Sequence, residues 1–312
     1  MKFYLSKQMA LLAVGLGVLA GCGGGNGTSS LSTTGGGTLI YVESPVPFVG
    51  DPESDAELFA VDSTGKNVRR LTTNTSQDRE PSVTRDGRTI VWSVMPKGAD
   101  SPEIHIMNSD GSNSRRLYPR GQFPTISPDG KLVAFVLGPF ICTIKPDGSD
   151  FRSLNAPQFQ QFFVNQPISF SSDGKRIAFG DEARKPGIYT VASDGSDLQT
   201  VALSSSKQFY REGVSYGPND EIVSGVRVRS DNGPEQSGLF IVRDDGTTGR
   251  IIGLGNERPV GPVWSPSGKE IAYSESPLSN NTPRTFGIII RSADGSSRRV
   301  IDGNGFEATW GG

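Results

Sequence analysis

Short runs of alternating apolar and polar residues follow one another along most of this chain. In the segment Glu270–Ser274, for example, Ile271 and Tyr273 point to one face and their neighbours to the other. This period of two predicts half-buried β-strands, and clusters of Gly, Pro, Asp and Ser separate the runs. Beyond the first 22 residues, no segment of useful length has the 3.6-residue period of an amphipathic helix. The pattern therefore predicts an all-β protein.

Two motifs alternate along the chain. In the first, an aliphatic residue stands seven positions before a turn glycine, at Leu58/Gly65, Ile104/Gly111, Ile141/Gly148, Ile188/Gly195, Leu239/Gly246 and Ile288/Gly295. The second is a strand–turn–strand motif that occurs as Ser127–Phe135, Ser171–Phe179, Ser265–Tyr273, Thr84–Trp92 and, in degenerate form, Gly217–Ser224. A repeat of roughly 40–50 residues built from short strands is typical of a β-propeller.

One repeat supplies the strands of one blade. In the last complete repeat, these are Pro262–Ser265, Glu270–Ser274, Phe286–Ser292 and Arg298–Ile301, each pair joined by a turn or loop. Six such repeats predict a six-bladed propeller of four-stranded antiparallel blades. Large apolar residues recur at fixed offsets from the first-turn glycine, which predicts packing between blades rather than a ligand site: Val83, Ile126, Phe170, Trp264, Trp92, Phe135, Phe179 and Tyr273.

The repeats are offset from the ends of the chain. Thr38–Ser44 matches the second strand of a blade, and Ala308–Trp310 matches the first strand. We therefore expect the C-terminal strand to complete the N-terminal blade. Such closure removes free sheet edges from the ring.

The first residues have the pattern of an export signal. Lys2 and Lys7 precede the apolar stretch Met9–Ala20, which is too short to span a membrane. Leu19–Cys22 resembles the lipobox of bacterial lipoproteins, in which the cysteine carries the lipid. We predict a lipoprotein signal peptide over 1–21, lipidation at Cys22, a Gly/Ser-rich tether over 22–37 and the propeller over 38–312. The alternative is an ordinary signal peptide that contains a cysteine.

Composition narrows the possible partners. Net charge is −2, from 31 basic and 33 acidic residues, and no stretch is strongly basic, so we expect no nucleic-acid partner. With Cys22 lipidated, Cys142 would have no disulfide partner, and we interpret it as a small structural residue. Gly23 is not the aspartate associated with inner-membrane retention. In a Gram-negative source this favours the outer membrane, facing the periplasm or the cell surface.

The repeats resemble the TolB-like family of β-propellers. The family signature, roughly P-x-W-S-P-D-G-x-x-I-A-Y followed by a second turn and R-R-L-T, is matched by Pro262–Tyr273, Glu57–Thr72 and Glu103–Leu117. The resemblance covers about residues 38–310 and implies a fold, while propellers of this family occur both as binding modules and as enzyme appendages. TolB carries an α/β domain before its propeller and is soluble in the periplasm. The tether and lipobox depart from that pattern, so a Tol–Pal partnership is not carried over.

Catalytic motifs are weak. Gly213–Gly217 matches the G-x-S-x-G elbow, but Ser215 falls on the first strand of a blade, and the chain's single histidine, His105, falls on a third strand. Prolyl-oligopeptidase relatives need a hydrolase domain, and related oligogalacturonate lyases rely on several histidines. The Asp-Gly turns at Asp110, Asp147, Asp194, Asp245 and Asp294 lack a full calcium loop and fit hairpin chemistry. We predict no catalytic residue, no metal and no cofactor.

Charged pairs on the fourth strands have two interpretations. Arg69–Arg70, Arg115–Arg116 and Arg298–Arg299 could contact lipid headgroups or an acidic partner. Charges on an outer strand also discourage edge pairing, and we favour that interpretation.

The loops that lead into each first strand converge on the channel and have the composition of a recognition surface. The predicted partner-binding residues in them are Arg79, Glu80, Gln122, Phe123, Gln166, Arg211, Glu212, Glu257, Arg258, Phe306 and Glu307. The loop Asn155–Gln166 is long and contains three phenylalanines (Phe159, Phe162 and Phe163), so it is a candidate cap for the channel.

We therefore predict a monomeric, lipid-anchored, non-catalytic propeller that binds an envelope protein or peptide at its channel face. One alternative is a glycan-active or hydrolytic enzyme using carboxylates such as Glu80, Glu212 and Glu307, which requires two carboxylates about 5–10 Å apart in a pocket. Another is a structural surface lipoprotein without a discrete ligand.

Overall fold

The computed structural model describes residues 37–44, 55–154, 161–231, 233–277, 287–302 and 305–311. The signal peptide, Cys22 and the tether lie outside these residues. Among the described residues, no helix has the length and apolar character of a membrane span. Every regular element of the described ranges is a β-strand, so the all-β prediction is confirmed.

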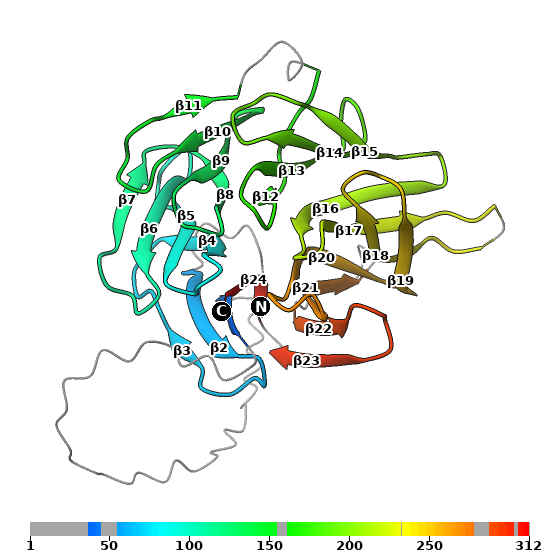
Figure 1. Ribbon diagram of the computed structural model, residues 1–312. Helices are drawn as coiled ribbons and strands as arrows, with labels where there is room; N and C mark the ends of the chain where they lie inside the picture. Colours follow the sequence, from blue (N-terminus) through cyan, green and yellow to red (C-terminus); the bar gives the residue numbers. More distant parts are fainter. Residues whose placement is uncertain are drawn as a thin grey trace, which may run out of the picture. The chain divides into compact units, whose positions relative to one another are not determined.

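The strands form six four-stranded antiparallel sheets, the blades (Figure 1). From the innermost to the outermost strand, blade 1 is β24 (Gly305–Gly311), β1 (Thr38–Glu43), β2 (Glu57–Asp62) and β3 (Arg69–Arg70); blade 2 is β4 (Gln77–Val83), β5 (Thr89–Met95), β6 (Glu103–Asn108) and β7 (Arg115–Tyr118); blade 3 is β8 (Gln122–Ile126), β9 (Val133–Leu137), β10 (Phe140–Ile144) and β11 (Arg152–Ser153).

The second half of the ring follows the same order. Blade 4 is β12 (Ser169–Phe170), β13 (Arg176–Asp181), β14 (Gly187–Ala192) and β15 (Gln199–Leu203); blade 5 is β16 (Gln208–Tyr216), β17 (Glu221–Val228), β18 (Gln236–Arg243) and β19 (Gly249–Gly255); blade 6 is β20 (Glu257–Trp264), β21 (Glu270–Pro277), β22 (Ile288–Ser292) and β23 (Arg298–Asp302). The innermost strands surround the centre of the ring (Figure 1).

The last strand closes the ring. β24 pairs antiparallel with β1, so that Trp310 faces Leu39 and Thr309 faces Ile40. The first blade is therefore built from both ends of the propeller sequence, as the offset of the repeats predicted. Because this strand is the innermost of its blade, its loss would expose the inner edge of β1.

The hydrophobic core is divided among the junctions between blades. Six clusters of buried side chains occur in the described residues, one between each pair of neighbouring blades. Seven of the eight apolar residues that recur at fixed offsets are buried, and Val83 is partly buried. A blade is apolar on both faces, so only its two neighbours can keep it out of water. Cys142 lies in the cluster between blades 2 and 3, where burial raises the pKa of its thiol.

The seven-residue spacing of the first motif has a simple structural basis. Each spaced aliphatic residue lies at or near the start of a third strand and is at most 1% exposed, and the matching glycine has a positive φ in the turn that follows. In the Asp-Gly turns, the Asp carboxylate accepts a hydrogen bond from the N–H two residues further on, as at Asp147 and Ser149 (2.9 Å). The pKa of Asp147 and of its equivalents is lowered mainly by a hydrogen bond from a neighbouring hydroxyl group, which is that of Ser149 at Asp147, and then by this N–H. The turns therefore have the hairpin role that the sequence predicted.

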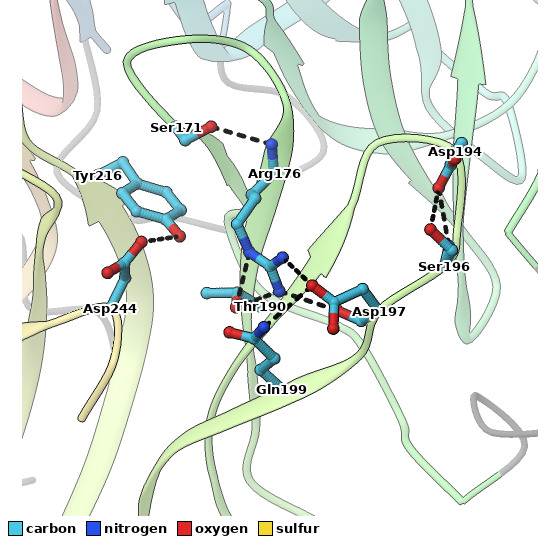
Figure 2. Close-up of polar contacts among 9 residues, drawn as sticks. All are labelled: Ser171, Arg176, Thr190, Asp194, Ser196, Asp197, Gln199, Tyr216 and Asp244. Atoms are coloured by element: carbon cyan, nitrogen blue, oxygen red, sulfur yellow. Dashed lines mark hydrogen bonds and ion pairs between the residues drawn. The ribbon is translucent and has the colours of Figure 1, made fainter.

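The second motif is held by a serine at the end of the innermost strand. In blade 4, Ser171 Oγ accepts the N–H of Arg176 (2.9 Å), as Figure 2 shows, and donates to Asp173 (2.7 Å). The Arg176 guanidinium reaches across the sheet to Thr190 Oγ1 (2.9 Å) and Asp197 (2.6 Å). One buried hydroxyl thus fixes both ends of the first hairpin.

Ser171→Ala should destabilise the protein by about 1–2 kcal/mol, because it leaves the Arg176 N–H without its acceptor inside the turn. The measurement is the midpoint of urea unfolding. Ser172→Ala is a matched control in the same turn, since the Ser172 side chain makes no hydrogen bond with the described residues. Equal midpoints for the two variants would contradict this account of the turn.

Candidate functional site

The innermost strands of all six blades surround a cavity of about 480 Å³, which we call the channel cavity. At one end it is lined by Glu80, Phe123, Gln166 and Glu307, which we call the channel mouth. At the other end it is lined by residues of the turns that follow the innermost strands, among them Arg85 and Pro266. A concave site with a few convergent polar groups is the default candidate for ligand binding.

A bulge in the innermost strands positions the mouth. Glu80 (φ 55°), Phe123 (φ 52°) and Glu307 (φ 51°) lie in β4, β8 and β24 with left-handed backbone, at points where the strand pairing shifts. At the equivalent bulges of β16 and β20 the residues are Gly213 and Gly261. Left-handed backbone costs a non-glycine residue about 1–2 kcal/mol. Backbone strain of this kind clusters at functional sites, so three residues with strained backbone at one channel mouth make it a functional candidate.

Side chains of the mouth also link successive blades. Glu307 Oε2 accepts the N–H of Glu80 (2.9 Å), and Glu80 Oε2 accepts the N–H of Phe123 (2.7 Å). In the same way, Gln166 Oε1 accepts the N–H of Gly213 (2.8 Å). Each side chain satisfies a backbone donor that the bulge removes from the strand ladder. An amide performs this role in blade 4 and a carboxylate in blades 1 and 2, so the role requires an acceptor and not an acid.

A second row of such bonds lies deeper in the channel. Ser82, Ser169 and Ser215 each accept the backbone N–H of the next blade, from Ile126 (3.2 Å), Tyr216 (3.1 Å) and Trp264 (3.3 Å). Ser215 is the central residue of the G-x-S-x-G match, and it lies on the innermost strand β16, as the sequence predicted. His105 lies on β6 in blade 2, bonded to Glu103 (3.0 Å). The elbow and its histidine do not form a catalytic pair.

Charge at the mouth is unevenly compensated. The Arg79 guanidinium binds Glu307 Oε1 at 2.5 Å, which neutralises that carboxylate. Glu80 faces the cavity with only part of its surface, and desolvation raises its pKa first, followed by the negative charge of Glu307. Hydrogen bonds from Phe123 and Ser93 and the charge of Arg79 oppose the rise, and the pKa of Glu80 comes to about 7.

Glu80→Gln should change the pH dependence of stability. The ordinary pKa of the carboxyl is 4.5, so between pH 4.5 and 7 the folded chain binds a proton that the unfolded chain has lost. Glu80 therefore stabilises the wild type below pH 4.5, and this contribution is lost as pH rises through 7. Relative to wild type, Glu80→Gln should gain roughly 1–3 kcal/mol between pH 5 and pH 8. Urea unfolding across that range measures the gain. Ser172→Ala, which also lines the cavity, should keep the wild-type profile; parallel profiles for all three proteins would contradict the assignment.

Two of the carboxylates named by the enzyme alternative line the channel mouth, and one of them, Glu307, is fully engaged. Glu80 and Glu307 lie in the same mouth, while the side chain of Glu212 lies outside the described residues. Both oxygens of Glu307 are occupied, one by Arg79 and one by the N–H of Glu80. A general base or nucleophile needs an oxygen directed at water or substrate. Within the described part of the chain, no group of three or more metal-binding side chains is placed to hold an ion.

The structure corrects two expectations about the predicted contact residues. They were expected in loops, but apart from Gln166 they lie within the innermost strands, because the bulge extends each strand past the channel mouth. Phe306 is buried in the cluster between blades 1 and 2, since its side chain points away from the channel in β24. Glu80, Phe123, Gln166 and Glu307 line the cavity; Arg79, Gln122, Glu257 and Arg258 do not. Arg211 lies in β16, and its side chain, like that of Glu212, is outside the described residues.

The loop rich in phenylalanine is only partly described, and Phe159 lies outside the described residues. Phe162 does not cap the channel: it is buried against Phe179 (5.4 Å between ring centroids) and Tyr189 (4.6 Å). Phe163 is 38% exposed. The residues that sequence reasoning missed are those of the second row, such as Ser82 and Ser169; aligning them with Ser215 in the repeats would have revealed the row.

Most guanidinium groups of the arginine pairs bind other residues of the propeller. Arg69 donates to the Ser109 carbonyl in the turn of the next blade (2.8 Å), and Arg115 donates to the Pro146 carbonyl. The second arginine of each of these two pairs binds an acidic residue of its own blade, as Arg116 does with Glu103 (2.8 Å). The pairs therefore fasten outer strands to neighbouring turns, a role that neither interpretation of the sequence included.

These blades define the class of the protein, a six-bladed β-propeller, and the solved structures with a similar fold include the propellers of TolB proteins. TolB from Acinetobacter baumannii is 17% identical with TM-score 0.69, covering 88% of this chain and 66% of that one, just under two thirds of its length. A protein assigned as TolB from Agrobacterium tumefaciens is 15% identical with TM-score 0.61, covering 88% and 98%. A chain of the nidogen/laminin complex is 12% identical with TM-score 0.62, covering 88% and 98%. No family model and no curated protein matches the sequence.

Proposed function

We propose that this protein is a non-catalytic binding propeller that takes a segment of an envelope protein, or a peptide, at the channel mouth. The observation that carries the proposal is the set of strained residues Glu80, Phe123 and Glu307, gathered where the channel cavity opens. They combine an aromatic surface with carboxylates on rigid strands, which is the composition of a recognition site. The comparison chain from a nidogen/laminin complex belongs to an assembly of two proteins, which agrees with this use of the fold.

The occupied oxygens of Glu307 favour binding over catalysis. Carboxylate-based hydrolysis needs two carboxyl groups that act on the substrate, and here one of them is held by Arg79 and by the backbone of Glu80. Gln166 makes the same inter-blade bond without being an acid. These contacts support a channel mouth that binds a partner rather than one that transfers protons to a substrate.

The proposed location is the bacterial cell envelope, with the chain anchored by lipid at Cys22. The apolar stretch Met9–Ala20 and the lipobox-like Leu19–Cys22 support it, as do the TolB proteins among the similar structures. In a Gram-negative source, the anchor would place the propeller on the outer membrane. The test is metabolic labelling with a fatty acid: labelled wild type and unlabelled Cys22→Ala support the anchor, and equal labelling contradicts it.

The proposed function is tested by affinity capture from detergent-solubilised envelope of the source cells. The site variant is Glu80→Gln with Phe123→Ala. The matched control is Glu270→Gln with Phe151→Ala, which changes the same residue types at positions that are 28% and 42% exposed and do not line the cavity. Thermal melts establish that both variants are folded.

A protein captured by wild type and control but not by the site variant would support the proposal. A protein captured equally by all three would place its contact elsewhere and contradict the site. Capture by none would favour the structural-surface-protein alternative.

A further inference from the structure

One carboxyl oxygen of Glu80 accepts hydrogen bonds from the protein, and the other is open to the channel cavity. Oε2 accepts two hydrogen bonds, from the Ser93 hydroxyl (2.8 Å) and from the Phe123 N–H (2.7 Å). These two donors occupy the acceptor positions of Oε2 and fix the orientation of the group. None of the described residues donates to Oε1, and this atom is not among the buried polar atoms without a partner. Since Glu80 lines the channel cavity, Oε1 is the oxygen that a ligand can reach.

This arrangement determines where a proton sits. A neutral carboxyl carries its proton on one oxygen, and the backbone N–H of Phe123, which can only donate, is accepted better by a carbonyl oxygen than by a protonated oxygen, so Oε2 keeps its carbonyl character. The proton of neutral Glu80 therefore lies on Oε1 and points toward the cavity. In the ionised form, the same Oε1 is a negatively charged acceptor.

The groups around Glu80 place its titration close to neutral pH. Glu307 on β24 contributes a neighbouring negative charge, and Arg79 on β4 directs its guanidinium mainly to Glu307 (2.5 Å). Ser93 on β5 and Phe123 on β8 contribute uncharged donors. Glu182, in the segment after β13, lines the same cavity. Burial and Glu307 favour the neutral form, and together they bring the pKa of Glu80 to about 7.

We propose that Glu80 makes binding at the channel mouth proton-linked, its Oε1 donating a hydrogen bond to a carbonyl oxygen of the bound segment when neutral and accepting one from an ammonium group when ionised. This inference rests on the proposed function of the mouth as a binding site. A segment that inserts a lysine side chain or an amino terminus would bind more tightly as pH rises through neutrality. A segment that presents only carbonyl oxygens would bind more tightly as pH falls.

The test is a carboxyl ¹³C NMR titration of protein labelled at glutamate, with the Glu80 resonance assigned by its absence in Glu80→Gln. The expected midpoint for Glu80 is near pH 7. Glu307→Gln removes the neighbouring negative charge and should lower that midpoint by about one pH unit. The ligand probes are N-acetyl-lysine methylamide and its uncharged isostere, N-acetyl-norleucine methylamide. Saturating lysine probe should lower the midpoint, because an ammonium stabilises the ionised form, and the norleucine probe should not.

Three results would overturn the proposal. One is a Glu80 midpoint in the ordinary range of glutamate. Another is a midpoint near 7 that the lysine probe leaves in place, and the third is an equal shift by both probes. Because the titration uses purified protein and small probes, its outcome is separate from that of the capture experiment. If the proton linkage fails but a protein is captured through the channel mouth, the protein-binding proposal still holds. If the proton linkage is observed but no protein is captured, the mouth is a proton-linked site for a small ligand.

Discussion

A chain that lacks its last six residues, 307–312, should lose most of its stability. The deletion removes Trp310, which is 8% exposed in the cluster between blades 6 and 1, and the pairing of β24 with Leu39 and Ile40. It also removes Glu307, which joins this strand to Arg79 and Glu80 of blade 2. Losing a large buried side chain, a strand and an ion pair together should cost more than about 5 kcal/mol, which is comparable with the whole stability of a typical domain.

Thermal denaturation followed by circular dichroism is the measurement, on chains that begin after Cys22. The truncated chain should melt at least about 10 °C below the full propeller or fail to fold. A chain ending at residue 311 keeps all of β24 and serves as the control. A full melting temperature for the chain ending at residue 306 would show that the ring does not depend on closure by this strand.

Replacing Trp92 with alanine should be among the most damaging single substitutions in the core. Trp92 is 2% exposed in the cluster between blades 1 and 2, and its Nε1–H donates to the buried Asp78 (2.9 Å). Alanine leaves a cavity at this junction and removes a donor from a buried carboxylate whose pKa burial already raises. The expected loss is about 3–5 kcal/mol.

Trp92→Phe separates the two contributions, because it keeps most of the ring volume and removes only the donor. Asp78 then retains the bond from Asn74 (2.6 Å), so the expected loss is about 1–2 kcal/mol. Urea unfolding of the two variants gives both values. If Trp92→Ala unfolded at the wild-type midpoint, the junctions between blades would not be the core of this protein.

The blades could be predicted from the sequence because their determinants are local and repeated. Gly148 and Ile141 stand in the same turn-and-strand relation as five other pairs, so one physical explanation covers all six. Closure could be predicted for the same reason: Trp310 and Trp264 hold the same place in the repeat, and both lie at or near the end of an innermost strand. The inter-blade position of Trp92 and its equivalents followed from their fixed offsets.

The residues of the channel mouth were harder to predict, because a shift of one residue along a strand moves a side chain from the core between blades to the channel cavity. Phe306 and Glu307 are adjacent in β24, yet Phe306 is buried between blades and Glu307 lines the channel. The bulge that sets this register is marked by glycine in blades 5 and 6, at Gly213 and Gly261, but by Glu80 in blade 2. Repeats aligned on those glycines would have identified the strained positions.

The electrostatics of the mouth could not be predicted from single residues. The proximity of Glu80 to Glu307 depends on ring closure, which brings together residues 227 positions apart in the chain. The elevated pKa of Glu80 then arises from burial and from this neighbour, and neither is visible in the local sequence. Sequence reasoning named both carboxylates as candidates, but only the assembled ring shows which oxygen remains open.

The most direct test of the central claim is site-specific photo-crosslinking in the envelope of the source cells. A photoreactive phenylalanine analogue at position 123 would lie at the channel mouth, and the same analogue at position 151 would lie on the outer rim, where Phe151 is 42% exposed. We expect a crosslinked partner from position 123 and none of the same mass from position 151. A partner crosslinked from position 151 alone would contradict a binding site at the channel mouth.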